Sequence, residues 1–168
     1  MLSPYQPKVQ QKLAHARLLL ESCAACGDLL PDRQKREAFL SSAVMQLGVA
    51  YGLYLKELAS QHQLPSVQTV HTLDQLSHEL LQRNLEDLSV SELQRLAQEG
   101  WLSDLNELVQ QAQYPAVALK QEALAVEVSL IASSNSDAGP DMDEQTVTRL
   151  LMELTQLVER QRHSNLEY

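Results

Sequence analysis

Aromatic residues, cysteine and glycine are all scarce in this sequence. Aromatic side chains make up 4% of the 168 residues, and there are two cysteines and five glycines. The N-terminal stretch MLSPYQPKVQQ also lacks the charged and apolar regions of a secretory signal. Because few cysteines and no signal are typical of a protein in a reducing compartment, we expect this one in the cytoplasm.

Positive charge is scarce as well. The chain has 13 Lys and Arg residues against 22 Asp and Glu residues, which gives a formal net charge of −9. Its one dense basic patch, Arg33, Lys35 and Arg36, is flanked by Asp32 and Glu37. Neutralising phosphates supplies most of the energy of nucleic-acid binding, so this composition argues against nucleic acid as a partner.

The familiar catalytic motifs are absent too. The sequence contains no G-x-S-x-G, no phosphate-binding glycine loop, no H-E-x-x-H and no dinucleotide fingerprint. We therefore predict no catalytic residue, no cofactor and no metal, and we lean against an enzyme. A catalytic pair that distant helices bring together stays open, because 22 carboxylates leave many pairings that the sequence does not resolve.

Two small groups of metal-binding residue types have simpler interpretations. Cys23 and Cys26 form a C-x-x-C, but a zinc site needs four ligands and there is no second cysteine pair. We interpret them as small buried thiols. His71 and His78 share a helical face with Asp74, yet they lie about 10 Å apart along a helix axis, which is too far for one ion. We expect both histidines to be exposed to solvent.

Leu, Gln, Ala and Glu are abundant, and these residues lose little conformational freedom in a helix. Hydrophobic residues make up 44% of the chain, which is typical of a globular protein. The length suits one domain, residues 1–168, with a single core. The stretch SSNSDAGPD, residues 133–141, predicts a flexible loop before the last helix.

Apolar residues recur every three or four positions in the first half of the chain, which predicts three helices. They cover about 8–30, 33–62 and 66–86. The buried face of the first comprises Val9, Leu13, Ala16, Leu20, Cys23, Gly27 and Leu30. The inward residues of the third are Val70, Leu73, Leu76, Leu80 and Leu81.

Shorter helices and one long helix follow. We expect Ser89 or Ser91 to cap a helix that ends near Gly100, and Ser103 to cap another that Pro115 bounds. Residues 115–132 alternate as a strand does near their end, but a lone strand has no partner, so we predict a helix. Asp141 or Asp143 caps the last helix, which ends near 162. Its apolar stripe is Val147, Leu150, Leu151, Leu154, Leu157 and Val158.

The longest apolar run is AFLSSAVMQLGVAYGLYL, residues 38–55. A helix of this length spans about 27 Å, slightly less than a hydrocarbon core of about 30 Å. Charged residues bound the run at both ends, and Ser41, Ser42 and Gln46 lie inside it. The other helices are amphipathic and need an apolar surface to cover. We therefore predict the central helix of a bundle and no membrane span.

Gly48 and Gly52 form a G-x-x-x-G inside this run, although each costs about 1 kcal/mol of helix propensity relative to alanine. Small residues let a neighbouring backbone approach, so the face packs against another helix or against a second copy in a homodimer. Alternatively it lines a groove for an apolar ligand, where Tyr51 and Tyr54 supply hydroxyl groups. The single tryptophan, Trp101, is either a core plug or an anchor for a partner.

Several stretches together resemble a known family. They are VQQKLAHARLLLES, REAFLSSAVMQLGVAYGLYLKELA, EGWLSDLNEL and LIASS. They resemble an uncharacterised all-helical family of gammaproteobacteria that is catalogued as a domain of unknown function. The resemblance implies a short, helical, cytoplasmic protein, and it brings no catalytic residues.

The helices predicted over 8–30 and 33–62 are also similar to the long antiparallel pair of HEPN-type bundles, which include toxin RNases. Active members carry an arginine followed about four to six residues later by a histidine, and no arginine here has such a partner. Lys56 and His62 have a related spacing, but lysine lacks the planar fork of arginine.

We predict an all-α, mostly antiparallel bundle of four main helices, with an excursion of short helices between about 89 and 114. The function that we expect first is a non-enzymatic interaction or regulatory protein of the bacterial cytoplasm, with a protein partner of unknown identity. The alternative is a small-molecule binder or enzyme with a pocket between helices near Tyr51 and Tyr54. A degenerate, HEPN-like bundle related to nucleic acid is the second alternative.

Overall fold

The computed structural model describes residues 3–114 and 139–164, and this part of the chain folds into α-helices and one short 3₁₀-helix. The elements are α1 (Gln6–Ala24), α2 (Leu30–Gln61), the 3₁₀-helix η1 (Val67–Thr69), α3 (Leu73–Gln82), α4 (Leu88–Glu99), α5 (Trp101–Gln113) and α7 (Glu144–Ser164). The described residues contain no strand, so the predicted all-α class is confirmed. Residues 115–132, for which we expect a helix, and 133–138 of the predicted loop lie outside the described residues.

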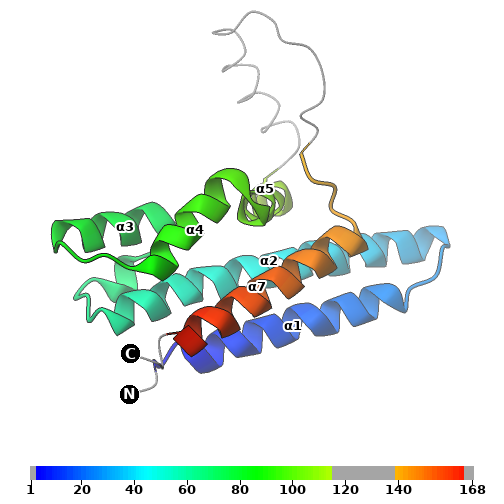
Figure 1. Ribbon diagram of the computed structural model, residues 1–168. Coiled ribbons are helices and arrows are strands. Elements are labelled where there is room, and N and C mark those ends of the chain that lie inside the picture. The colour runs from blue at the N-terminus through cyan, green and yellow to red at the C-terminus, as the bar shows by residue number, and fades with distance from the viewer. Residues whose placement is uncertain (1–2, 115–138, 165–168) are drawn as a thin grey trace, which may run out of the picture.

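The three long helices α1, α2 and α7 lie side by side (Figure 1). An ion pair between Arg36 and Glu144 joins the beginnings of α2 and α7, and one between Glu57 and Arg162 joins their ends. These two helices therefore run in the same direction, while α1 runs opposite to both (Figure 1). The predicted antiparallel order holds for α1, but not for α2 with α7.

The short helices α3, α4 and α5 lie over the long helix α2 and lead the chain back toward the beginning of α2 (Figure 1). Such a return is necessary because neighbouring parallel elements need a long connection. Helix α5 contacts α2, α4 and α7. The prediction of four main helices is not confirmed, because the third helix has 10 residues and the described part contains three long helices.

Helix α1 ends earlier than the pattern of apolar residues predicts. The backbone N–H of Cys26 donates to the carbonyl of Cys23, 3.0 Å away, and this tight turn ends the helix. Pro31 then lies in the first turn of α2, a position that needs no N–H donor. Gly27 and Leu30 consequently do not belong to the buried face of α1, whereas the five expected positions before them are all buried.

The helix that we expect over 66–86 is interrupted. Helix α3 begins only after Thr72, whose hydroxyl accepts a hydrogen bond from the backbone N–H of Gln75, 3.2 Å away. The side-chain oxygen of Gln75 in turn accepts a hydrogen bond from the backbone N–H of Thr72. This reciprocal capping box fixes the start of the helix. Leu76 and Leu80 define its buried face, so the neighbouring Leu81 is 74% exposed and its predicted inward position is wrong.

Carboxylates cap two other helices. Asp87 accepts a hydrogen bond from the N–H of Val90 and caps α4, so the expectation of Ser89 or Ser91 is wrong. Helix α5 begins at Trp101 after Gly100, which places Ser103 inside the first turn. The Asp143 carboxylate is 2.7 Å from the N–H of Thr146 and lies at the start of α7, as we expect.

Helix α2 forms the centre of the core. It is the one described helix that is long and apolar enough to cross a membrane, with a mean hydropathy of 1.4 in its most apolar window. One third of that window, 33%, is buried inside the fold. Helices α1, α5 and α7 all pack against it. The packing of three helices against α2 agrees with a core helix for residues 38–55, but with 33% of the window buried the helix is not enclosed on all sides.

Candidate functional site

Gly48 and Gly52 lie one turn apart on α2 but have different surroundings. A Cβ atom at Gly48 would be 2.9 Å from Cγ2 of Val109 on α5, so the glycine permits close packing of the two helices. A Cβ atom at Gly52 would meet nothing within 4 Å among the described residues. The packing interpretation therefore fits Gly48, and the groove interpretation fits Gly52.

The space over Gly52 belongs to a surface groove with a volume of about 600 Å³, which we call the Gly52 groove. One wall is α2, the second is the segment that leads into α3, and the third is α5. Most of its apolar lining residues are half-buried, and its polar lining residues other than Tyr51 are exposed. Prominent lining residues are Met45, Val49, Tyr51, Asp74, Asn106 and Val109.

Tyr51 lines this groove and has an unusual environment. Its side chain is 9% exposed, and its hydroxyl is shielded from solvent without a hydrogen-bond partner among the described residues. A buried hydroxyl without a partner costs about 1–3 kcal/mol, so such groups are uncommon. Burial, and to a lesser extent the charge of Asp74, raises the pKa of Tyr51 well above its ordinary value. The phenol of Tyr51 is therefore harder to ionise than that of an exposed tyrosine.

Tyr54 does not share the groove with Tyr51. Its hydroxyl donates to Oε1 of Gln161 on α7, 2.6 Å away. The amide of Gln161 in turn donates to Glu92 on α4, at 2.8 Å, and to the carbonyl of Ser89. The structure thus places Tyr54 in a buried polar network that joins α2, α4 and α7, away from Gly48, Tyr51 and Gly52.

A buried ion pair lies in the same region. Arg162 on α7 donates two hydrogen bonds to Glu57 on α2, from Nε at 2.8 Å and from a terminal nitrogen at 2.7 Å. Glu57 is only 1% exposed, so it depends on this partner. Sequence reasoning missed the pair. The available signal is that Glu57 follows the buried Tyr54 by three positions and Arg162 follows the buried Val158 by four, so both continue a buried face.

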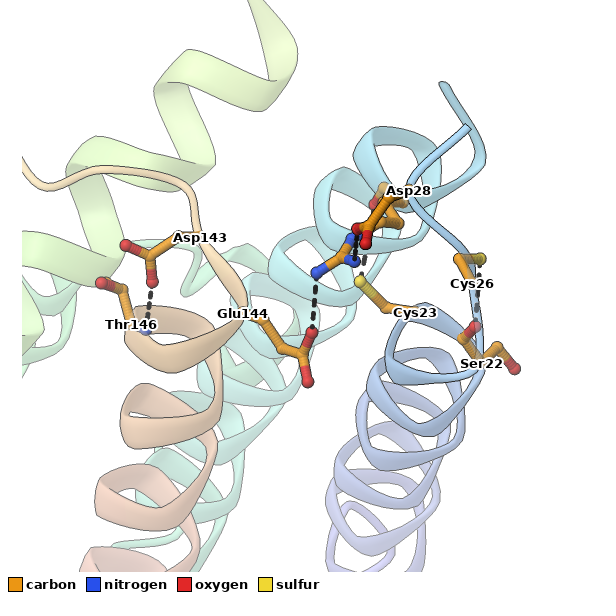
Figure 2. A network of polar contacts seen from close by, with 8 residues as sticks. Ser22, Cys23, Cys26, Asp28, Asp143, Glu144 and Thr146 are labelled. Atoms are coloured by element: carbon orange, nitrogen blue, oxygen red, sulfur yellow. Dashed lines mark hydrogen bonds and ion pairs between the residues drawn. The ribbon is translucent and has the colours of Figure 1, made fainter. Parts of the chain in front are cut away.

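The two cysteines near the end of α1 face different neighbours (Figure 2). Cys23 is buried, and its thiol lies 3.8 Å from the backbone carbonyl of Arg36. Burial raises the pKa of this thiol, which makes it a poor nucleophile. Cys26 is partly exposed, and its thiol contacts the carbonyl of Ser22 at 3.3 Å. The interpretation as a buried thiol thus fits Cys23 better than Cys26.

Arg36 connects this corner to Glu144 at the start of α7. Its guanidinium lies 3.4 Å from Glu144 and 3.7 Å from Asp28. No group of three or more His, Cys, Asp or Glu residues in the described part of the chain is arranged to hold a metal ion. The ion pair between Arg36 and Glu144 joins the beginnings of α2 and α7.

The remaining candidates lie in separate places. His71 and His78 are exposed, as we expect, and His71 lines the Gly52 groove. Trp101 is partly buried and packs against the core, which favours the core-plug interpretation. Lys56 donates to the carbonyl of Gln68 at 3.2 Å, whereas His62 pairs with Asp87. The two residues with the HEPN-related spacing therefore have separate partners.

The fold and the groove define an all-α protein with a candidate binding site over its central helix. The chain belongs to a family of unknown function, DUF6586, which matches residues 1–168. This match confirms the resemblance to a domain of unknown function and gives no support to the HEPN resemblance. The chain matches no curated protein and no solved structure.

Proposed function

We propose that this protein is a non-enzymatic binding protein and that the Gly52 groove takes the apolar part of a small organic molecule. The observation that carries this proposal is the open space at Gly52. A glycine inside a helix costs about 1 kcal/mol relative to alanine, and the contact with Val109 accounts for Gly48 only. A ligand above α2 accounts for Gly52.

The size and the lining of the groove support a small ligand. Its volume of about 600 Å³ lies within the range of about 300–1,000 Å³ that is usual for ligand sites. Met45, Val49 and Val109 supply apolar walls, and a few polar groups stand at the edge. Such a lining holds an apolar body and orients it through few hydrogen bonds. The proposal keeps the cytoplasmic location and the absence of a membrane span that we expect from the sequence.

A leucine at position 52 tests the proposal. The Gly52→Leu side chain would occupy the open space, so the fold should remain stable while ligand binding fails. We would measure the binding of Nile red, a neutral apolar dye, by fluorescence, and we would use native mass spectrometry to find molecules that copurify with the protein. Gly52→Ala is the matched control, because a single methyl group should leave most of the groove open. Equal binding by the wild type and Gly52→Leu would contradict the proposal.

A second candidate function is interaction with a protein partner, and the turn between α3 and α4 favours it. Leu81 and Leu88 are 74% and 90% exposed, and Leu85 lies between them in the chain, also exposed. Exposed clusters of large apolar residues mark interaction sites. Affinity capture from the host with the wild type and with Leu88→Glu tests this candidate. A stoichiometric partner that Leu88→Glu loses would support it, whereas light scattering would reveal a second copy instead.

A further inference from the structure

The turn between α3 and α4, residues 81–88, presents three large apolar side chains to solvent, and we call it the leucine turn. Leu81, Leu85 and Leu88 are 74%, 39% and 90% exposed. Among the described residues, no other large apolar side chain is as exposed as Leu88. Covering apolar surface is favourable in water, so a partner that packs on this turn would gain stability from all three leucines.

The backbone of the leucine turn is well defined. The N–H of Asn84 donates to the carbonyl of Leu81, and the N–H of Leu85 donates to the carbonyl five residues before it, both at 3.0 Å. With a positive φ of 54° at Asn84, this is the Schellman end of a helix. Helix α2 ends in the same way at Gln63, and there the equivalent leucine, Leu64, is only 3% exposed. The described fold therefore covers the leucine of one cap and leaves Leu85 of the other partly open.

Two unpaired charges of opposite sign flank Leu85. Arg83 and Glu86 are both exposed. They are three positions apart, yet they form an ion pair neither with each other nor with another described residue. Asp87, the other charged residue of the turn, is largely buried and interacts with His62. The exposed charges of the leucine turn therefore cancel, although the whole chain has a net charge of −9.

We propose that the leucine turn binds a second copy of this chain, related by a two-fold axis close to Leu85. In such an interface both copies use the same surface, and each contact occurs twice. The axis places Arg83 of each copy opposite Glu86 of the other, around a centre of leucines. A strongly charged partner would leave one of these two residues facing a like charge, whereas a second copy satisfies both. This inference rests on the second candidate function, because it names the partner of the same surface.

The small size of the leucine turn predicts a weak dimer. Stable interfaces involve about 20–30 residues on each side, so we expect a dissociation constant on the order of 100 µM. Sedimentation equilibrium of the full chain between about 10 µM and about 1 mM covers this range, at an ionic strength of about 0.15 M that screens the net charge. The protein should be a monomer at the lowest concentration and mostly a dimer at the highest.

A leucine variant locates the interface. Leu81→Gln keeps the charge of the chain and the helix propensity of the position. It should weaken the dimer by about tenfold, because a symmetric interface loses the side chain twice. Leu18→Gln is the matched control, since Leu18 is an exposed leucine on α1 outside the turn, and this variant should associate as the wild type does. A dimer that Leu81→Gln leaves unchanged would overturn the proposal.

Charge reversal distinguishes a second copy from any other partner. Arg83→Glu and Glu86→Arg should each weaken the dimer by about three- to tenfold, because each places like charges opposite one another twice. Glu86→Arg also makes the chain less acidic, so general repulsion alone would predict tighter association. An equimolar mixture of the two variants should associate as the wild type does, since every facing pair then has opposite signs. Glu99→Arg, at the other end of α4, is the matched control and should not weaken the dimer.

The outcomes separate this inference from the second candidate function. If the mixture of Arg83→Glu and Glu86→Arg associates no more tightly than either variant alone, the proposed pairing is wrong. If the wild type remains a monomer at the highest concentration but captures a protein that Leu88→Glu loses, the inference fails and the second candidate stands. If the wild type neither dimerises nor captures such a protein, both fail.

Discussion

Gly48 and Gly52 differ by one helical turn, and alanine should affect them differently. At Gly52 the added methyl group meets no described atom within 4 Å, so Gly52→Ala should raise the free energy of unfolding by about 1 kcal/mol through helix propensity alone. At Gly48 the methyl group would lie 2.9 Å from Val109 on α5, and the β-branched valine has little freedom to move away. Gly48→Ala should therefore leave the free energy of unfolding unchanged or lower it.

Urea unfolding of both variants beside the wild type measures this difference. The comparison is well matched, because the two substitutions change the same helix by the same atoms. A gain of similar size at both positions would show that α5 does not pack closely against Gly48.

The buried phenols Tyr51 and Tyr54 should make the fold sensitive to alkaline pH. Burial raises the pKa of both, and the charges of Asp74 and Glu57 respectively add to the effect. The folded state therefore keeps protons that the unfolded state releases above about pH 10, the ordinary pKa of tyrosine. Stability is fully present below that pH and is lost as the pH rises toward the folded-state values. Each tyrosine contributes a slope of up to about 1.4 kcal/mol per pH unit.

Unfolding by urea at several pH values between about 8 and 11 checks this dependence. Tyr51→Phe and Tyr54→Phe should each reduce the slope relative to the wild type, and the subtraction removes the common contribution of the lysines. A slope that neither substitution changes would mean that both phenols ionise as easily in the folded protein as in the unfolded chain.

At the scale of elements, the ion pair between Glu57 and Arg162 joins the ends of α2 and α7. Because Glu57 is almost completely buried, Arg162→Met should leave an unpaired buried charge and cost about 3–5 kcal/mol. The double variant Glu57→Leu with Arg162→Met should cost less than the single one, since it leaves no charge behind. The exposed pair of Arg149 and Asp104 offers a control, and Arg149→Met should cost less than about 1 kcal/mol.

Thermal or urea unfolding of these variants gives the required free energies, and the double-mutant cycle separates the pair from its surroundings. The buried and the exposed pair join α7 to different helices, so the control also reports on α5. Equal costs for Arg162→Met and Arg149→Met would contradict the central role of the buried pair.

The elements also show which features the sequence reveals. The buried faces of α1 and α7 follow from local spacing, because residues three and four apart share one side of a helix. The start of α3 depends on the pairing of Thr72 with Gln75 rather than on apolar spacing, and the pattern alone runs through it. The partner of Glu57 lies 105 residues away in the chain, and no local rule connects the two.

The sequence predicts the candidate site only in part, because its local motif is visible but its tertiary contacts are not. The G-x-x-x-G draws attention to Gly48 and Gly52 because glycine is costly inside a helix. Which glycine packs and which stays open depends on where α5 crosses α2, a tertiary contact. Tyr51 and Tyr54 are close in sequence but face different neighbours, and their separation likewise requires the positions of α4 and α7.

At the scale of the whole molecule, the parallel direction of α2 and α7 explains why the chain needs α3, α4 and α5. Helix α2 ends far from where α7 begins, and the excursion of short helices carries the chain back (Figure 1). The periodicity of apolar residues gives no information on direction, because a helix buries the same face whichever way it runs. The sequence therefore predicts the short helices α4 and α5, but it predicts a long helix where the short α3 lies, and it does not indicate their role.

The charge distribution of the whole molecule argues for a last prediction, that the protein neither binds nor cleaves RNA. With a net charge of −9, the chain repels phosphates. Several of its described cations, namely Lys35, Arg36, Arg149, Arg160 and Arg162, are already paired with carboxylates. Fluorescence anisotropy with a labelled single-stranded RNA should show no binding even at low salt, where electrostatic attraction is strongest.

A cleavage assay on the same RNA completes the test, with a basic nuclease as the positive control. His62 interacts with Asp87, the cap of α4, so we assign it a role in holding α2 to α4. His62→Ala should therefore lower the free energy of unfolding and leave RNA untouched, as the wild type does. Cleavage by the purified wild type that His62→Ala abolishes, under conditions in which the variant remains folded, would restore the HEPN-like alternative. Such a result would also require cations that are available to bind phosphate, and the five cations named above are paired with carboxylates instead.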